Sequence, residues 1–281
     1  MNLRDARALV TGASGGIGAA IVREIVGRGG KALITGRDAR SLHDLARSLD
    51  PDGNSLAVHV ADIAKECDRS SLVDAATTWR GGVNVLVNNA GVASFGAFAK
   101  MRPEDLEQSF AVNTLAPMQL CRALLPHLQR QPAAHIVNIG SVFGAIGYPG
   151  HAAYSATKFA LRGFSEALRR ELGDGALRIH YLAPRATRTS FNCAAVEELN
   201  AQLAVTTDPP ERVAAAVCRM LETGQTEATI GWPEKLFVRI NGLFPWLVDR
   251  SLARQLPIIQ ERFVLPHAAP LSIQPVSRQS S

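Results

Sequence analysis

The chain has 281 residues, of which 47% are hydrophobic and 20% are charged, and its formal net charge is +5. This mixture is typical of a folded globular protein and excludes disorder as the main state. The basic residues are scattered, without the one-sided cluster of a nucleic-acid-binding protein, and no apolar run is long enough to span a membrane. The four cysteines lie far apart and follow no secretory signal, so we expect a cytoplasmic location.

Short apolar runs alternate with helical patterns over most of the chain. The first run, Arg7 to Thr11, ends in a glycine-rich turn, and the pattern from Ile17 onward has helical spacing. The later runs are KALIT, SLAVHV, NVLVNNAG, HIVNI and LRIHYLA, with helical segments between them. Because these runs are apolar throughout, we predict an α/β fold of the Rossmann type, a doubly wound parallel sheet covered on both faces.

We expect one Rossmann-type domain over residues 1–231 and a C-terminal extension over 232–281. Residues 186–207 are polar and rich in turns, which is typical of a mobile segment beside a substrate site. The last dozen residues are expected to be poorly ordered.

The first turn, TGASGGIG, runs from Thr11 to Gly18 between a predicted strand and a predicted helix. Its backbone N–H groups and the helix N-terminus can receive a pyrophosphate, and Gly12, Gly16 and Gly18 permit close approach. The alternative is a tight turn without a ligand.

The second strand ends in Gly36 and Arg37, where a dinucleotide site distinguishes a ribose hydroxyl from a 2′-phosphate. Asp38 could bind the hydroxyl, but it also precedes a helical run, where aspartate is a good N-cap. We prefer the cap, and Arg37 then favours NADP(H) over NAD(H). The alternative for Arg37 is a solvated residue at the helix start.

Tyr154 and Lys158 stand four residues apart in a helical pattern, so their side chains share one face. We expect the ammonium to lower the pKa of the phenol by about two units and make it an acid/base near neutral pH. Ser141 closes the strand HIVNI thirteen residues earlier, and Asn113 lies in another predicted helix. Taken singly, each of these residues also has an ordinary structural interpretation.

In order and spacing these motifs resemble the short-chain dehydrogenase/reductase family over roughly the first 190 residues. The residues that carry the resemblance are those of TGASGGIG, Asp62, NNAG (Asn88 to Gly91), Asn113, Ser141, Tyr154 and Lys158. The resemblance implies that Tyr154 exchanges a proton with the substrate oxygen and that Lys158 holds the nicotinamide ribose. It also implies that Ser141 orients the carbonyl and that Asn113 supports a water relay.

The motifs and the resemblance together give a set of cofactor-binding residues. Asp62 is expected at the adenine edge, and Thr189 at the nicotinamide carboxamide. The whole set comprises Gly12, Ser14, Gly16, Ile17, Gly18, Arg37, Asp62, Ile63, Asn89, Gly91, Tyr154, Lys158 and Thr189.

The chain departs from the family pattern after LRIHYLA, where Arg185 replaces the glycine of a Pro-Gly turn. A positive φ there would strain a bulky side chain, so either the turn differs or its conformation accepts arginine. Arg185 is interpreted either as a contact to an acidic substrate group or the cofactor phosphates, or as a surface arginine.

The segment Glu234 to Leu252 carries an apolar stripe at helical spacing, which Pro245 would kink. The favoured interpretation is a helix packed on the core or on a subunit partner. A wall of a hydrophobic substrate pocket and a helix lying on a membrane surface are the alternatives.

The sequence therefore predicts an NADP(H)-dependent oxidoreductase that interconverts a carbonyl compound, hydrophobic or with an acyl chain, and a secondary alcohol. A catalytically silent NADP(H)-sensing protein and a membrane-surface reductase of a lipid pathway are the alternatives. We expect a homodimer or homotetramer with a small-molecule substrate, no nucleic acid and no transmembrane span, although peripheral membrane contact is compatible. No metal is expected, since no His, Cys and Asp grouping has ligand spacing.

Overall fold

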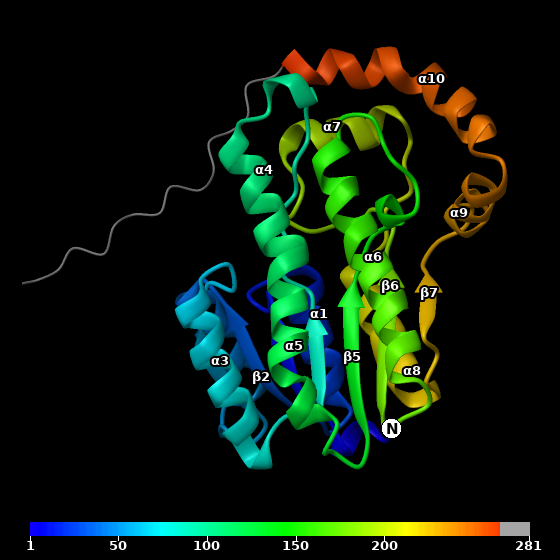
Figure 1. The fold of residues 1–281 in the computed structure, drawn as a ribbon. Helices are drawn as coiled ribbons and strands as arrows, with labels where there is room; N and C mark the ends of the chain where they lie inside the picture. The colour runs from blue at the N-terminus through cyan, green and yellow to red at the C-terminus, as the bar shows by residue number, and fades with distance from the viewer. Residues whose placement is uncertain (265–281) are drawn as a thin grey trace, which may run out of the picture.

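The computed structural model describes residues 1–264, and its centre is a seven-stranded sheet in the order β3-β2-β1-β4-β5-β6-β7 (Figure 1). All the neighbouring strands run parallel. The strands are β1 (Arg7–Thr11), β2 (Lys31–Gly36), β3 (Leu56–Val60), β4 (Val85–Asn88), β5 (Ala134–Ile139), β6 (Leu177–Ala183) and β7 (Glu227–Thr229).

Helices cover both faces of this sheet. The helices are α1 (Gly16–Gly27), α2 (Ala39–Leu49), α3 (Glu66–Thr78), α4 (Pro103–Phe110), α5 (Ala116–Leu128), α6 (Ala152–Leu172), α7 (Ala194–Gln202), α8 (Pro210–Thr223), α9 (Glu234–Leu243) and α10 (Pro245–Glu261). Side chains of α1, α2 and α8 join one hydrophobic cluster, and those of α3, α5 and α6 join the other. The predicted doubly wound α/β fold is confirmed.

The apolar character of the strands follows from this layering. In β1, Ala8 and Val10 belong to the cluster on one face and Leu9 to the cluster on the other, because successive side chains of a strand point to opposite faces. A strand covered on both sides must be apolar at nearly every position. This is why the strands appear in the sequence as continuous apolar runs.

The strand order reverses between β1 and β4, which creates a crevice at the carboxyl edge of the sheet. Thr11, the last residue of β1, ties the two strand ends together. Its hydroxyl donates to the Val87 carbonyl at 3.3 Å and accepts from the backbone N–H groups of Asn89 and Ala90 at 3.0 Å each. The glycine turn and the NNAG segment therefore stand face to face across the crevice.

The predicted C-terminal helix is in fact two helices, α9 and α10, which run along the outside of the molecule (Figure 1). They are separated at Phe244, whose φ of −138° and ψ of 64° interrupt the helix just before Pro245. Val248 is buried, but Leu236, Phe237 and Leu243 are exposed, so most of the stripe does not pack on the core of this chain. The division of the chain at residue 231 stays a prediction, and the expectation for the last dozen residues lies outside the described range.

Candidate active site

The four predicted catalytic residues come from three segments that meet above the carboxyl edge of the sheet. Ser141 follows β5 and caps a short 3-10 turn, and its hydroxyl accepts from the Phe143 N–H at 3.1 Å. Tyr154 and Lys158 lie on the first turns of α6 and are buried. Asn113 lies in a π-helical turn between α4 and α5 and is fully buried.

The phenol of Tyr154 is shielded from water, and its side chain is 9% exposed. Burial raises the pKa of Tyr154 to about 12, while a hydrogen bond with Ser141 acts in the opposite direction. The sequence-based expectation of a lowered pKa is therefore wrong for this structure. Its physical reason is that withdrawing a phenolate from water disfavours the charged form more than the Ser141 hydrogen bond favours it.

The ammonium of Lys158 is equally buried, and it does not bond to the phenol. Its Nζ donates to the carbonyl of Ile139 at 3.0 Å and lies 5.7 Å from the centre of the Tyr154 ring. Burial lowers the pKa of Lys158 to about 8. The predicted proximity of the two side chains is thus observed, together with a hydrogen bond to the end of β5 that spacing did not indicate.

Asn113 connects the catalytic helix to the segment after β4. Its amide exchanges two hydrogen bonds with the backbone of Val92, at 2.8 and 2.9 Å, and donates to Thr157 Oγ1 at 3.2 Å. Pro117 has no N–H to offer the Asn113 carbonyl four residues earlier, so the regular helical bond cannot form there. That spacing was a signal for the π-helical turn which the sequence analysis did not use.

The glycine turn has the shape that a phosphate cradle requires. Gly12 and Gly16 have φ of +65° and +55°, and a Cβ on Gly18 would lie 2.1 Å from the Gly12 carbonyl oxygen. The side-chain amide of Asn89 fixes the turn by donating to the carbonyls of Thr11 and Gly12. No side chain caps the N-terminus of α1, and the space above Gly15 is open. The residues present therefore fit a pyrophosphate at this helix end.

The remaining predicted cofactor residues border the same crevice or its β2 and β3 ends. The Ser14 hydroxyl lies beside Gly36 at the end of β2, and Arg37 next to it is exposed. Asp38 caps α2 by accepting from the Ser41 N–H at 3.2 Å, which confirms the preferred interpretation of this aspartate. Asp62 and Ile63 follow the end of β3, and neither lies beside the glycines of the turn.

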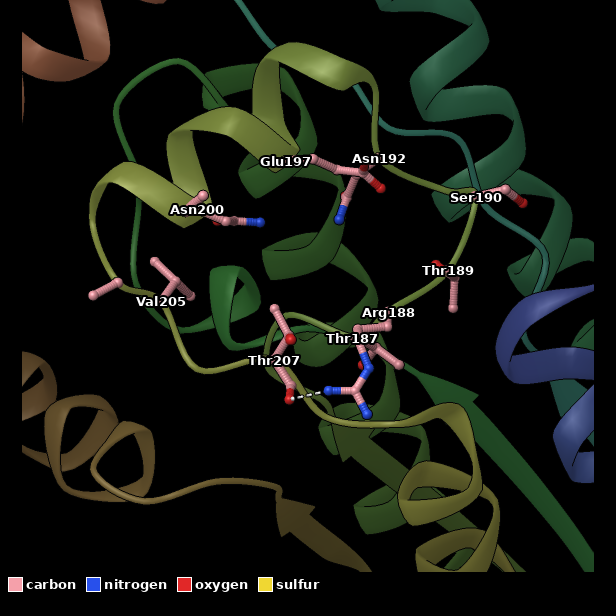
Figure 2. A pocket seen from close by; sticks show the side chains of 11 residues that line it. Thr187, Arg188, Thr189, Ser190, Asn192, Glu197, Asn200, Val205 and Thr207 are labelled. Atoms are coloured by element: carbon pink, nitrogen blue, oxygen red, sulfur yellow. Dashed lines mark hydrogen bonds between the residues drawn. The ribbon is translucent and has the colours of Figure 1, made fainter.

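The segment after β6 closes one side of the crevice. The Thr189 side chain packs on Gly16, at 3.1 and 3.2 Å from the position of an added Cβ. Phe191 lies against Gly91, and its ring centre is 6.1 Å from that of Tyr154. A cavity of about 780 Å³ opens between residues 187–192 and α7 (Figure 2). The structure thus brings Thr189 to the glycine turn, and its expected contact with the nicotinamide carboxamide stays a prediction.

An aromatic wall surrounds Tyr154, and the sequence analysis did not identify it as a group. Phe143 and Tyr148 stack at 4.9 Å between ring centres, and the His151 ring lies 6.1 Å from that of Tyr154. Burial lowers the pKa of His151 to about 4, against the effect of its hydrogen bond with Ser94, so the ring is neutral at pH 7. The clustering of Phe143, Tyr148 and His151 within nine residues was an available signal. No grouping of metal ligands occurs within residues 1–264.

Arg185 corrects both sequence-based interpretations, because its side chain is largely buried and is held by acidic residues of this chain. Its guanidinium forms a two-pronged ion pair with Asp208 at 2.9 and 2.8 Å and also reaches Glu234 at 3.3 Å. The guanidinium-bearing side chain is only 8% exposed. Arg80 and Ala204 are the non-glycine residues with positive φ in the described chain, so Arg185 fits the turn without strain. Neither partner is near in sequence, which is why spacing gave no hint of this pair.

Comparison with known proteins assigns the chain to a family. A model of the short chain dehydrogenase family matches residues 6–200. An uncharacterized oxidoreductase of Bacillus subtilis, YxnA, is 31% identical over 258 residues, which cover 90% of this chain and 72% of YxnA. The 3-oxoacyl-(acyl-carrier-protein) reductase FabG of Escherichia coli K12 is 31% identical over 201 residues, or 72% of this chain and 81% of FabG.

Solved structures agree with this assignment. A short-chain dehydrogenase from Streptomyces avermitilis has a TM-score of 0.76 at 28% identity and covers 92% of this chain and 99% of its own. A 3-ketoacyl-(acyl-carrier-protein) reductase from Brucella melitensis, described as complexed with NADH, has a TM-score of 0.76 at 25% identity. The match covers 83% of this chain and 99% of the Brucella chain. The fold and the matched family model define an oxidoreductase. The chain belongs to the short-chain dehydrogenase family.

We predict that Arg185→Ala lowers the free energy of unfolding by about 3 kcal/mol, because it leaves the buried Asp208 with a single exposed partner, Arg212. Burial alone would raise the pKa of Asp208, and the two guanidiniums hold it below its usual range. The matched control, Arg212→Ala, removes the exposed partner and should cost less than about 1 kcal/mol. Urea unfolding followed by circular dichroism measures both. Equal losses of unfolding free energy in the two variants would show that Arg185 is not the main partner of the buried Asp208.

Proposed function

We propose that this protein is an NADP(H)-dependent oxidoreductase that interconverts a carbonyl compound and a secondary alcohol, with Tyr154 as proton donor and acceptor. The observation that supports this most strongly is the grouping of Ser141, Tyr154 and Lys158 at the same carboxyl edge of the sheet as the glycine cradle. A binding protein that only senses the cofactor has no need of a buried phenol beside a hydroxyl and an amine. Membership of an oxidoreductase family points the same way.

The cofactor would be held at three places along the crevice. The N-terminus of α1 and the glycine turn suit a pyrophosphate, and Arg37 suits a 2′-phosphate at the end of β2. Lys158 would hold the nicotinamide ribose, and Thr189 the carboxamide. When bound, a nicotinamide cofactor supplies or accepts the hydride.

The chain's own residues handle the substrate oxygen and its proton. The phenol of Tyr154 carries its proton at neutral pH, as an ordinary tyrosine does, and can donate it to a carbonyl oxygen as negative charge develops there. The Ser141 oxygen accepts from the Phe143 N–H, so its one hydrogen can donate to the Tyr154 oxygen or, with substrate bound, to the substrate oxygen. Each donor aimed at a developing oxyanion contributes about 3 kcal/mol in comparable sites. Lys158 keeps a positive charge near the phenol when it is protonated.

The surroundings of Tyr154 favour a hydrophobic substrate, including one with an acyl chain. The rings of Phe143, the neutral His151 and Phe191 lie around the phenol, and Tyr148 packs on Phe143 and His151. Binding an apolar group against such a wall removes apolar surface from water, whereas a sugar would lose hydrogen bonds to water there. Similarity to two proteins named as reductases of acyl-carrier-protein-linked oxoacyl groups also supports this class.

Replacement of the proton donor tests the proposed chemistry. We expect Tyr154→Phe to lower turnover by about 10²- to 10⁴-fold, since the general acid is gone, while the dissociation constant for NADPH changes little. The assay follows NADPH absorbance with a panel of aliphatic ketones and 3-oxoacyl thioesters. Tyr148→Phe is the matched control, because Tyr148 belongs to the same aromatic wall and its hydroxyl bonds to Gln255 instead. Near-normal turnover by the Tyr154 variant would remove the proposed donor.

The choice of cofactor rests on Arg37 and has its own test. We expect wild-type protein to bind NADPH more tightly than NADH, and Arg37→Gln to weaken NADPH at least about tenfold through loss of a charge-assisted hydrogen bond. NADH binding should hardly change in this variant. Arg40→Gln on the exposed surface of α2 is the control for a general loss of positive charge. Isothermal titration calorimetry measures the six affinities of the three proteins for the two cofactors, and equal affinity of the wild type for both cofactors would refute the role of Arg37.

A further inference from the structure

Most of the strongly exposed large apolar side chains of the described chain lie in one stretch, residues 232–247. They are Trp232, Leu236, Phe237, Leu243, Phe244, Trp246 and Leu247. Single exposed apolar residues are common on protein surfaces, but a contiguous group of this kind marks a site of interaction.

The group is concentrated where α9 gives way to α10, and we call Leu243, Phe244, Trp246 and Leu247 the apolar corner. Leu243 is 73% exposed and Trp246 is 55% exposed. The backbone of Phe244 leaves the helical region just before Pro245, so the chain turns and presents these side chains outward. Figure 1 shows the two helices following the outer edge of the molecule, with the turn between them on its periphery.

Helices α9 and α10, which together we call the arm, are held to the rest of the protein through other side chains. Detachment of the arm therefore does not explain the exposure of the corner. On α9, Asn241 Nδ2 donates to the Ala145 carbonyl at 2.9 Å. On α10, Gln255 accepts from the Tyr148 hydroxyl at 3.1 Å, and Val248 and Ile259 are buried. The inward faces of both helices are therefore satisfied, while the corner has no covering element among residues 1–264.

Positive charge flanks the corner on both helices. Lys235 and Arg239 lie on α9, Arg250 and Arg254 lie on α10, and all four are exposed without an ion pair to any described residue. Glu234 is already paired with Arg185. The guanidinium of Arg250 lies 5.9 Å from the ring centre of Trp246, at the border between the apolar and basic surfaces.

We propose that the apolar corner and its basic flanks seat the protein on the surface of an anionic lipid bilayer. Exposed tryptophan side chains are suited to the boundary between headgroups and acyl chains, and flanking lysine and arginine side chains are attracted to anionic headgroups. A second copy of the chain is the less favourable occupant, because a two-fold contact would bring the same basic flanks together. No helix within residues 1–264 is long and apolar enough to cross a membrane, so the contact is peripheral.

Binding of the corner to a bilayer would bring the candidate active site close to the membrane surface. The arm is bonded to Ala145 and Tyr148, which lie in the segment between Ser141 and Tyr154. A bilayer against the corner therefore lies near the loops that border the candidate active site, and a hydrophobic substrate could pass between them with little exposure to water. The membrane contact itself does not depend on the proposed function.

The test uses the full-length protein and vesicles of phosphatidylcholine with or without phosphatidylglycerol. We expect the wild type to co-sediment with the anionic vesicles and its tryptophan fluorescence to shift to shorter wavelength. Leu243→Ser/Trp246→Ser should weaken vesicle binding at least about tenfold by removing apolar insertion. Arg250→Gln/Arg254→Gln should weaken it about fivefold per charge, and added salt should have the same effect on the wild type.

Val60→Ser/Phe98→Ser is the matched control, because both side chains are exposed and apolar but lie far from the corner in sequence. Its vesicle binding should equal that of the wild type, and thermal melting should show all the variants folded. Equal weakening of the corner and control variants, or no binding by the wild type, would overturn the proposal. Self-association that sedimentation velocity detects and the corner variant abolishes, without vesicle binding, would instead assign the corner to a second copy.

Discussion

Tyr154 and Lys158 lie one helical turn apart on α6, and both are withdrawn from water. Burial favours the uncharged form of each group, so the pKa of the phenol rises to about 12 and that of the amine falls to about 8. The phenol is consequently protonated at neutral pH, and the pKa of the amine lies close to neutral pH. The proposed chemistry depends on the fixed positions of these two neighbouring groups, since a raised pKa by itself makes the phenol a weaker acid.

The rest of the fold keeps these two side chains in place. The end of β5 supplies the Ile139 carbonyl to Lys158, and the turn that follows supplies Ser141 to Tyr154. Asn113 joins α6 to the segment after β4 through Thr157. The glycine turn follows β1, which pairs with β4 at the point where the strand order reverses, so the carboxyl edge of one sheet carries both halves of the site. The ion pair between Arg185 and Asp208 joins the segment after β6 to the segment before α8, at a position where the family pattern has glycine.

The local features were predictable from sequence because they follow from chain geometry. Continuous apolar strands indicate a covered sheet, and the aspartate before a helical run indicates the Asp38 cap. What sequence could not show depends on segments far apart in the chain. Asp208 and Glu234 reach Arg185 only in the folded protein, and desolvation of Tyr154 outweighs the effect expected of Lys158. The cytoplasmic location and assembly as a homodimer or homotetramer stay predictions, since neither is encoded in the packing of a single chain.

The protonation of the buried phenol is measured most directly by an ultraviolet titration of phenolate absorbance, taken as the difference between the wild type and the Tyr154→Phe variant. The subtraction isolates Tyr154 from Tyr148 and Tyr181, and circular dichroism marks the pH range over which the protein stays folded. We predict no ionisation step for Tyr154 until the pH approaches 12. A step at or below the ordinary tyrosine value of about 10 would contradict the account, because the phenol would then be solvated or already activated by the amine.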